Sequence, residues 1–239
     1  MSEEWQKRSR MLIGEDALAR LANSRVAVFG LGGVGGIAVE ALARSGIGSL
    51  VIVDSDTVEK SNINRQLVAF RSTVGKSKVR EFEKRIYDIN PDIDLIPKEV
   101  YFSAETANEF DFGSFDYVID AIDSVASKLE LVQICKERGR QIVSSMGMGK
   151  RIDPLQVSVC DIYKTVNCPI ATIMRKELRK RDIKELRVVT STEKPISTHC
   201  DEDGVSEMPR APASMMIVPS VAGLLLANEA ISHIIGRGQ

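Results

Sequence analysis

The sequence predicts an α/β protein with a doubly wound, mostly parallel sheet and a C-terminal extension. Strand-like apolar runs alternate with helical segments from about residue 20 to about residue 150, and a glycine turn plus a helix joins the first two runs. The 239 residues are 44% hydrophobic and 27% charged, as in ordinary globular proteins. We expect one domain over 1–239, with a core at about 20–150 and a C-terminal lobe at about 151–239.

Residues 25–54 supply the first βαβ unit. A β-branched run at 25–30 stops at a glycine, a helical pattern at 37–48 also ends in glycine, and a second apolar run fills 49–54. A right-handed crossover makes these two strands parallel, so the predicted fold is Rossmann-like.

The later segments continue the alternation. In the core we expect strands at 94–101, 115–123 and 140–147, helices at 76–89 and 124–139, and a helix of about ten residues between the first two of these strands. In the C-terminal lobe we expect strands at 155–162 and 187–196, a helix at 169–183, an acidic loop at 201–207 and an apolar helix within 211–235.

The composition excludes several classes of protein. A net charge of −1 excludes a polycationic coat protein. The four cysteines, Cys135, Cys160, Cys168 and Cys200, form neither a CxxC pair nor a dense disulfide framework, which favours the reducing cytoplasm. The amino terminus lacks a secretory signal, and polar residues interrupt the apolar stretch at 211–235. We therefore expect that stretch to be a buried or dimer-facing helix instead of a membrane span.

The glycine turn is a candidate nucleotide site. Its glycines are Gly30, Gly32, Gly33 and Gly35. They follow a strand and open a helix, where glycines let the backbone approach a pyrophosphate. Asp54 ends the next strand, where a carboxylate can accept hydrogen bonds from ribose hydroxyls. This pattern predicts an adenine nucleotide and does not separate NAD from ATP.

Polar and basic residues after Asp54 favour phosphoryl chemistry. These residues are Asp56, Asn62, Asn64, Arg65, Gln66 and Lys78. Phosphoryl transfer needs cations that neutralise phosphate charge, and Arg65 and Lys78 are candidates for that role. The alternative is that both are solvated surface charges.

Asp120 and Asp123 follow at the end of the strand predicted at 115–123. Open α/β sheets bind ligands at this edge, and one of the two carboxylates should face the site. Asp123 is the better placed to hold Mg²⁺ through oxygen ligands. The alternative is that Asp123 caps the following helix.

A basic segment near residue 180 is a candidate tRNA-binding surface. Its selected cations are Arg175, Lys176, Arg179, Lys180, Arg181 and Lys184. On a helix several of them share one side, as binding to a phosphate backbone needs. The alternative is a solvated helix face of mixed charge.

The motifs GLGGVG, VDSDTVEKSNINRQ, VGKSKV, INP and DAIDS occur in this order. Over about residues 5–150 they resemble the superfamily of ubiquitin-activating enzymes and molybdopterin- or thiamine-type adenylyltransferases. The resemblance implies that Asp54 holds the ribose, Arg65 and Lys78 contact the phosphates, and Asp123 coordinates magnesium. It also implies that Asn62 and Gln66 shape the nucleotide pocket. Arg10 resembles an arginine that family members lend to the ATP of a partner subunit, which implies a homodimer.

ARSGIG, DAIDSV and the tail from DPLQVSVCDI to VVTSTEKP resemble one branch over nearly the whole chain, the tRNA threonylcarbamoyladenosine dehydratase family. The resemblance implies that ATP adenylates the threonyl carboxylate on adenosine 37 of tRNA, after which the modified base closes into a ring. An acyl-adenylate attacked from within the same substituent needs no enzyme nucleophile.

Three rivals stay open at this point. The first is an adenylyltransferase for a ubiquitin-like sulfur carrier, although the paired CxxC zinc motifs usual there are absent from the sequence. The others are an NAD-dependent oxidoreductase and a tRNA-binding protein without activity. Some dehydratase-family members have a cysteine where this chain reads RAPAS at 210–214, so a sulfur-transfer role at that position has no support. A sulfur-relay protein partner is left open, and we expect the cysteines to be buried or inert.

Overall fold

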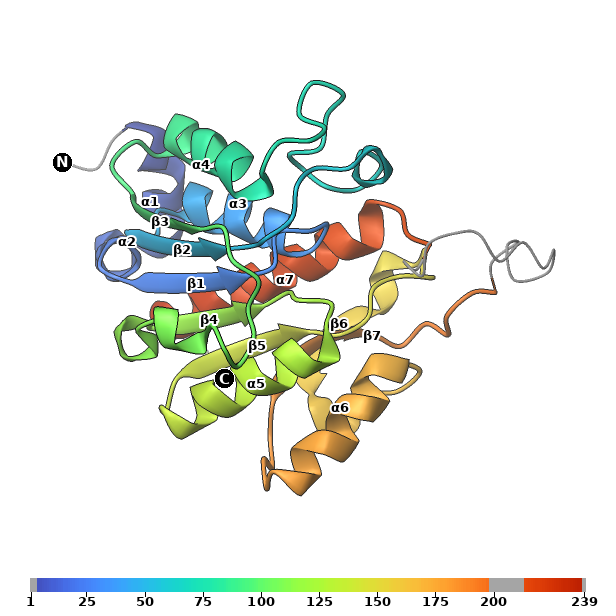
Figure 1. Ribbon diagram of the computed structural model, residues 1–239. Helices are drawn as coiled ribbons and strands as arrows, with labels where there is room; N and C mark the ends of the chain where they lie inside the picture. Colours follow the sequence, from blue (N-terminus) through green and yellow to red (C-terminus); the bar gives the residue numbers. More distant parts are fainter. Residues whose placement is uncertain (1–3, 198–212, 238–239) are drawn as a thin grey trace.

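The computed structural model describes residues 4–197 and 213–237, which form one seven-stranded sheet flanked by helices (Figure 1). The strand order is β3-β2-β1-β4-β5-β7-β6. Every neighbouring pair is parallel except β6 and β7, which are antiparallel. The predicted doubly wound, mostly parallel sheet is therefore confirmed.

The strands are β1 (Arg25–Phe29), β2 (Ser49–Val53), β3 (Asp94–Lys98), β4 (Tyr117–Asp120), β5 (Gln141–Ser145), β6 (Val157–Asp161) and β7 (Arg187–Ser191). The α-helices are α1 (Lys7–Ile13), α2 (Glu15–Ala22), α3 (Gly35–Ser45), α4 (Lys78–Ile89), α5 (Val125–Glu137), α6 (Pro169–Lys180) and α7 (Ile217–Ile234). Six short 3₁₀ turns complete the described elements: η1 (Glu4–Gln6), η2 (Lys60–Asn62), η3 (Ala107–Glu109), η4 (Phe112–Ser114), η5 (Pro154–Gln156) and η6 (Ile162–Lys164).

Helices cover both faces of the sheet, because each buried strand must place side chains in two cores. One core packs α2, α3, α4 and α7 against the sheet, and the other packs α5, α6 and a group of phenylalanines against the opposite face (Figure 1). The N-terminal and C-terminal parts thus share one sheet, with β7 and β6 continuing it beyond β5.

The segment between β3 and β4 differs from the prediction. In place of a helix of about ten residues it contains η3 and η4. Phe102, Phe110 and Phe112 pack around the ring of Phe29, with ring centroids 4.9, 5.2 and 6.1 Å away. The segment is irregular because all three rings are buried at one point of the sheet. These tertiary contacts override the local helix propensity of the segment.

Several boundaries also differ. The predicted strand 115–123 ends at Asp120, the predicted helix 169–183 ends at Lys180, and the predicted strand 187–196 ends at Ser191. Beyond α6, Asp182 has φ +52°, a left-handed conformation that cannot continue a right-handed helix. The acidic loop predicted at 201–207 lies outside the described residues.

Helix α7 is long and apolar enough, by length and composition alone, to cross a membrane. Here it lies against the sheet beside α3 (Figure 1), with Val218, Ala222 and Leu226 almost fully buried. Gly223 allows the close approach, since a Cβ there would come within 2.3 Å of the Val34 carbonyl oxygen. One side of α7 therefore forms core, as predicted for a buried helix, while Leu224 on the other side is exposed.

Candidate functional site

The glycine turn connects β1 to α3 at the carboxyl edge of the parallel strands. Gly30 has φ +89°, and a Cβ there would come within 2.6 Å of the Ala121 carbonyl oxygen. A Cβ on Gly35 would lie 1.8 Å from the carbonyl oxygen of Gly30, so glycine closes the turn at both positions. Gly32 is less crowded, because a Cβ there would meet only the Gln66 side-chain nitrogen within 4 Å, at an ordinary contact distance of 3.8 Å. We call this side of the turn the cradle.

The amino end of α3 lies at this turn and has no side-chain cap. Its N-cap residue is Val34, whose side chain has no hydrogen-bonding atom. The first-turn N–H groups and the positive end of the helix dipole therefore favour an anion here. This is the geometry in which a glycine turn binds phosphate.

Asp54 lies directly after β2 and holds the turn in place. Its carboxylate accepts hydrogen bonds from the backbone N–H of Leu31 at 2.6 Å and of Asp56 at 2.8 Å. Burial raises the pKa of the carboxyl above its ordinary value, although the Lys78 ammonium and the two backbone donors act in the opposite direction. A carboxylate has lone pairs beyond those two contacts, so Asp54 can also accept from a ribose hydroxyl.

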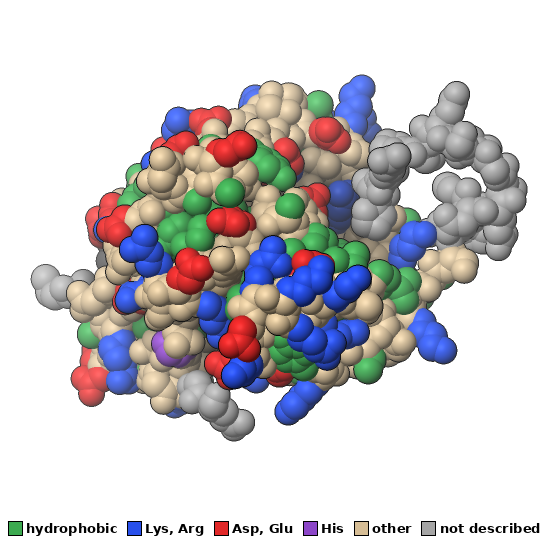
Figure 2. Space-filling model, turned by 60° about the horizontal axis from the view of Figure 1, so that its bottom comes forward, with side chains coloured by type: hydrophobic (Ala, Val, Ile, Leu, Met, Phe, Trp, Pro, Cys, Tyr) green, Lys and Arg blue, Asp and Glu red, His purple; other side chains and the backbone are tan. Residues whose placement is uncertain are grey.

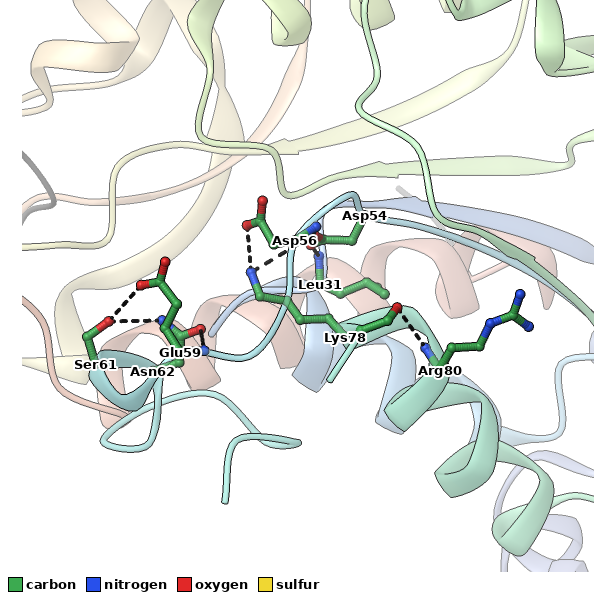
Figure 3. A network of polar contacts seen from close by, with 9 residues as sticks. Leu31, Asp54, Asp56, Glu59, Ser61, Asn62, Lys78 and Arg80 are labelled. Atoms are coloured by element: carbon green, nitrogen blue, oxygen red, sulfur yellow. Dashed lines mark hydrogen bonds and ion pairs between the residues drawn. The ribbon is translucent and has the colours of Figure 1, made fainter. Parts of the chain in front are cut away.

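Lys78 reaches from the start of α4 into the same edge (Figure 3). Its Nζ lies 2.7 Å from Asp56 Oδ2 and 3.9 Å from Asp54 Oδ1, and its side chain is only 6% exposed. A buried ammonium needs anionic partners. An incoming phosphate can replace the Asp56 carboxylate, which is 66% exposed and can turn toward water.

The segment 60–66 covers the glycine turn. Arg65 lies against Gly33, with its Cγ 3.4 Å from the position of a Cβ there. Its guanidinium donates to the Ser61 carbonyl oxygen at 2.9 Å and to Asn64 Oδ1 at 3.0 Å. Gln66 is buried beside Gly32, and its Oε1 has no hydrogen-bond partner in the described chain. An unpaired buried acceptor beside the glycine turn fits a ligand that donates a hydrogen bond.

Asn62 is buried one turn earlier and has a local structural contact. Its Oδ1 accepts from the backbone N–H of Glu59 at 3.1 Å, which forms a capping box around η2 (Figure 3). Asn62 thus holds the segment that carries Arg65 and Gln66, because the backbone N–H groups of both donate to its carbonyl oxygen.

Asp120 and Asp123 have different surroundings. Asp120 is fully buried: its Oδ2 lies 3.0 Å from the Lys128 Nζ and accepts from Ser144, and its Oδ1 accepts from the Ile122 N–H at 3.1 Å. Asp123 lies beyond β4 and is exposed. It does not cap α5, because Ser124 accepts from the Ser127 N–H there. The cap alternative is therefore wrong, and Asp123 is free to face the site edge.

The exposed carboxylate of Asp123 can be compared with the ligands that Mg²⁺ takes in proteins. Among residues 4–197 and 213–237, no group of three His, Cys, Asp or Glu side chains forms a metal cage. Mg²⁺ commonly takes only one or two carboxylates and completes its coordination with substrate phosphates and water. The donor set at Asp123 fits that mode.

Arg10 lies away from the other predicted site residues. It is on α1, and its Nε is 2.8 Å from Glu15 Oε1. The neighbouring helix α2 ends beside the start of β2, where the Gly48 N–H donates to the Leu21 carbonyl oxygen. Helices α1 and α2 therefore lie at the edge where the strands begin, opposite the glycine turn (Figure 1).

The basic residues of α6 lie on a third surface. Figure 2, which brings the bottom of Figure 1 forward, shows Lys and Arg side chains gathered on this face of the molecule. Lys180 and Arg181 both contact Glu177, at 2.7 and 3.3 Å. Arg175 donates to Thr165 and Thr172. Lys176 is exposed, Arg179 lies over a tyrosine ring, and Lys184 is 3.8 Å from Asp182.

The described cysteines are not activated thiols. Cys135 and Cys168 are buried and Cys160 is partly buried. Burial raises the pKa of the Cys135 thiol to about 12 and also raises that of Cys160. Thiolates of Cys135 and Cys160 are therefore scarce at neutral pH. Cys200 lies outside the described residues.

Two buried cations escaped the sequence prediction. Lys128 is 2% exposed and also donates to the Ser145 carbonyl oxygen at 2.7 Å, which ties α5 to the end of β5. Arg151 donates to the carbonyl oxygens of Gly147, Gly149 and Asn167. The sequence could have indicated Lys128, because a lysine stands there at an inward position of α5. No local pattern indicates Arg151.

Comparisons with known proteins show which family the chain resembles. The ThiF family model matches residues 6–239. A tRNA threonylcarbamoyladenosine dehydratase from Bacillus subtilis is 41% identical over 238 residues, 95% of this chain and 93% of the relative. Two crystal structures of the Escherichia coli tRNA N6-threonylcarbamoyladenosine dehydratase match with 30% and 31% identity, covering 99% of this chain and 97% of theirs. Their TM-scores are 0.89 for the complex with AMP and 0.88 for the complex with ATP.

Proposed function

The chain belongs to the ThiF family, and from that premise we propose that it is an ATP-dependent enzyme that dehydrates N6-threonylcarbamoyladenosine at position 37 of tRNA. The relative that is similar over nearly the whole length of both chains has this dehydratase activity in its name. In the structure, the observation that carries the proposal is the cradle beside Gly32, where buried Gln66 has an unpaired amide oxygen and α3 presents an uncapped amino end.

In this proposal ATP occupies the cradle, with its ribose on Asp54 and its phosphates near the cations Arg65 and Lys78. The glycine turn gives the phosphates backbone N–H groups, and Lys78 exchanges its Asp56 contact for a phosphate oxygen. Both cations then stabilise the charge that develops on the phosphate oxygens during transfer. A magnesium ion held by Asp123, when bound, would supply further neutralisation of that charge.

The chemistry proceeds in two steps with no covalent enzyme intermediate. The threonyl carboxylate attacks the α-phosphorus, so an acyl–O–P bond forms and pyrophosphate leaves. An atom of the same substituent then attacks the activated carbonyl, the ring closes and AMP leaves. The net change in the nucleoside is the loss of one water. Because the second nucleophile is already tethered, proximity replaces an enzyme thiol, in agreement with the buried cysteines.

A homodimer would complete the site. Arg10 is at the edge opposite its own glycine turn, so a second copy has to supply it to the phosphates (Figure 1). Met11 and Leu12, next to it on α1, are 81% and 77% exposed in the single chain. Large apolar side chains that stand together at the surface mark an interaction site.

The cations of α6 would bind the tRNA backbone, since phosphate contacts position a nucleic acid without reading its sequence. We place the enzyme in the cytoplasm, where its tRNA substrate and reduced cysteines are both expected. A sulfur-relay protein partner is left open, and residues 210–212 lie outside the described part of the chain.

The test is incubation with ATP and threonylcarbamoyl-modified tRNA, followed by mass analysis of the nucleosides. We expect the modified adenosine to lose one water, with AMP and pyrophosphate released in equal amounts. The principal alternative is an adenylyltransferase for a ubiquitin-like sulfur carrier. ATP–pyrophosphate exchange that requires a protein ending in Gly-Gly, without dehydration of the tRNA, would favour that alternative.

A further inference from the structure

We propose that a hollow at the C-terminal end of α6 binds one backbone phosphate of the tRNA, at a distance from the reacting nucleotide. The hollow measures about 350 Å³ and is lined by Tyr163, Arg179, Asp182, Ile183 and Lys184. The inference rests on the proposed function, because it presumes a tRNA substrate. Helix α6, which has several cations, would then contact the tRNA at one defined point.

Arg179 is held ready for an anion. Its guanidinium lies 5.1 Å from the centroid of the Tyr163 ring, within the range of a cation–π contact. The hydroxyl of Tyr163 donates to the Ile183 carbonyl oxygen, which fixes the ring beneath the guanidinium. In the described chain the Arg179 side chain has no hydrogen-bond or ion-pair partner, so its N–H donors are available to a ligand. A planar guanidinium oriented in advance loses little entropy when it binds phosphate.

Other cations of α6 are less suited to this role. Glu177 contacts both Lys180 and Arg181, which reduces the charge that they offer to RNA. Arg175 has its donors on Thr165 and Thr172. Exposed charges of similar appearance thus differ in what they can bind, and Arg179 is the one that faces a hollow.

The hollow has a net charge of +1, because Arg179 and Lys184 are cationic and Asp182 is anionic. Lys184 and Asp182 are 83% and 88% exposed, with their charged atoms 3.8 Å apart. A bound phosphate would replace Asp182 as the partner of the Lys184 ammonium, and the Asp182 carboxylate would then repel the phosphate. Removing that carboxylate should therefore strengthen RNA binding. Since Asp182 has φ +52°, asparagine is the suitable replacement, as it tolerates this conformation equally well.

The location defines what the contact does. Helix α6 begins beside the carboxyl end of β5, where a Cβ on Gly147 would lie 3.3 Å from Ile170. Its 12 residues place the hollow about 18 Å farther along, at 1.5 Å per residue. A group so far from the glycine turn cannot touch the reacting atoms. It can orient a large substrate by its backbone, so its loss should raise the tRNA KM and leave kcat and the ATP KM unchanged.

The experiment compares Arg179→Ala, Asp182→Asn and Tyr163→Leu with wild type in tRNA binding and dehydration. Arg179→Ala should weaken tRNA binding about tenfold and reduce the slope of log K against log salt by about 1. Asp182→Asn should tighten binding severalfold. Tyr163→Leu keeps the charge and releases the guanidinium, so it should weaken binding by less than Arg179→Ala. The control is Arg44→Ala on α3, an exposed arginine paired with Glu40, which should match wild type.

The outcomes separate this inference from the proposed function. If wild type dehydrates the tRNA while Arg179→Ala and Asp182→Asn bind it as wild type does, the hollow is not a phosphate site and the function stands. Weaker binding with an unchanged salt slope would overturn the phosphate assignment. If wild type does not dehydrate the tRNA, the proposed function fails, and this inference fails with it.

Discussion

At the scale of single residues, two carboxylates three positions apart differ in their roles because a strand ends between them. Asp120 still belongs to β4, and its side chain points into the protein toward Lys128 and Ser144. Asp123 follows the strand and is exposed at the edge that carries the glycine turn. The sequence favours Asp123 as the carboxylate that faces the site, and in the structure Asp120 is buried whereas Asp123 is exposed.

The exposed carboxylate and the arginine over the glycine turn should both be essential. Asp123→Ala and Arg65→Ala should each lower the rate of tRNA-dependent pyrophosphate release at least about a hundredfold, because each acts on phosphate charge in the transition state. Circular dichroism should show an unchanged fold, and Asp92→Ala, at an exposed turn, should retain activity. Near-normal turnover in either variant would contradict the site assignment.

The inward carboxylate leads to a prediction about stability. Lys128→Met should lower the free energy of unfolding by about 3–5 kcal/mol, because it leaves Asp120 buried without its cation. The double variant Asp120→Asn with Lys128→Met should be more stable than Lys128→Met alone, since no uncompensated charge remains. Urea denaturation of wild type, both single variants and the double variant measures the coupling. Additive effects would show that the two side chains do not stabilise each other.

At the scale of elements, ion pairs connect helices that lie side by side. Glu40 on α3 accepts from Arg85 on α4 at 2.7 Å and from Arg44 on its own helix at 2.7 Å. Burial raises the pKa of the Glu40 carboxyl, but the hydrogen bonds from Arg85 and Arg44 outweigh it, so the pKa lies below its ordinary value. The two helices are thereby joined on the outer face of the core that contains α7.

This depressed pKa predicts how stability depends on pH. The ionised form of Glu40 is favoured by folding, so its contribution is present above the ordinary pKa of a glutamate, about 4.3, and is lost as the pH falls through the lowered folded value. Glu40→Gln should therefore cost about 1 kcal/mol at pH 7 and nothing at a pH below that lowered value. Thermal unfolding across this range checks it, and an equal loss at all pH values would rule out the ion pairs as its cause.

The basic helix makes a separate prediction. Lys180→Glu with Arg181→Glu should weaken tRNA binding about tenfold or more and reduce its salt dependence, while ATP affinity stays unchanged. With Glu177, the two new glutamates form a group of three acidic side chains, which adds to the repulsion of the tRNA phosphates. Lys84→Glu on α4, similarly exposed and paired with Glu81, is the matched control. Unchanged tRNA affinity in the double variant would remove α6 from the binding surface.

The sequence predicted the elements whose signals are local. The strands around the glycine turn are short apolar runs, and helix α5 is a longer segment followed by Gly139; all three lie close to where they are expected. The segment between β3 and β4 could not be predicted, because its form depends on the contact of Phe102 and Phe110 with Phe29, far away in the chain. The same holds for the site. Its motif residues can be found in the sequence, but the contact between Asp120 and Lys128 is tertiary and could not be predicted.

At the scale of the whole molecule, the topology gathers chemistry at one edge of the sheet. Parallel strands deliver Gly30, Asp54 and Asp123 to the same side because each follows the carboxyl end of its strand. Helix α1, which carries Arg10, lies at the opposite edge (Figure 1), and the five residues of β1 separate the two edges by about 17 Å at roughly 3.3 Å per residue. A single copy cannot bring Arg10 to its own glycine turn.

Mixing two inactive variants tests whether a second copy supplies this arginine. In the proposed dimer each site uses Asp123 of one subunit and Arg10 of the other, so Arg10→Ala and Asp123→Ala should each be inactive alone. After subunits exchange at equal amounts, half of the dimers contain one subunit of each kind, and one of their two sites has both residues. The mixture should therefore recover about a quarter of wild-type activity by statistical pairing, since symmetric dimers place the same residues at both sites. If Arg10 acts within its own subunit, each subunit lacks one residue of its own site and the mixture stays inactive.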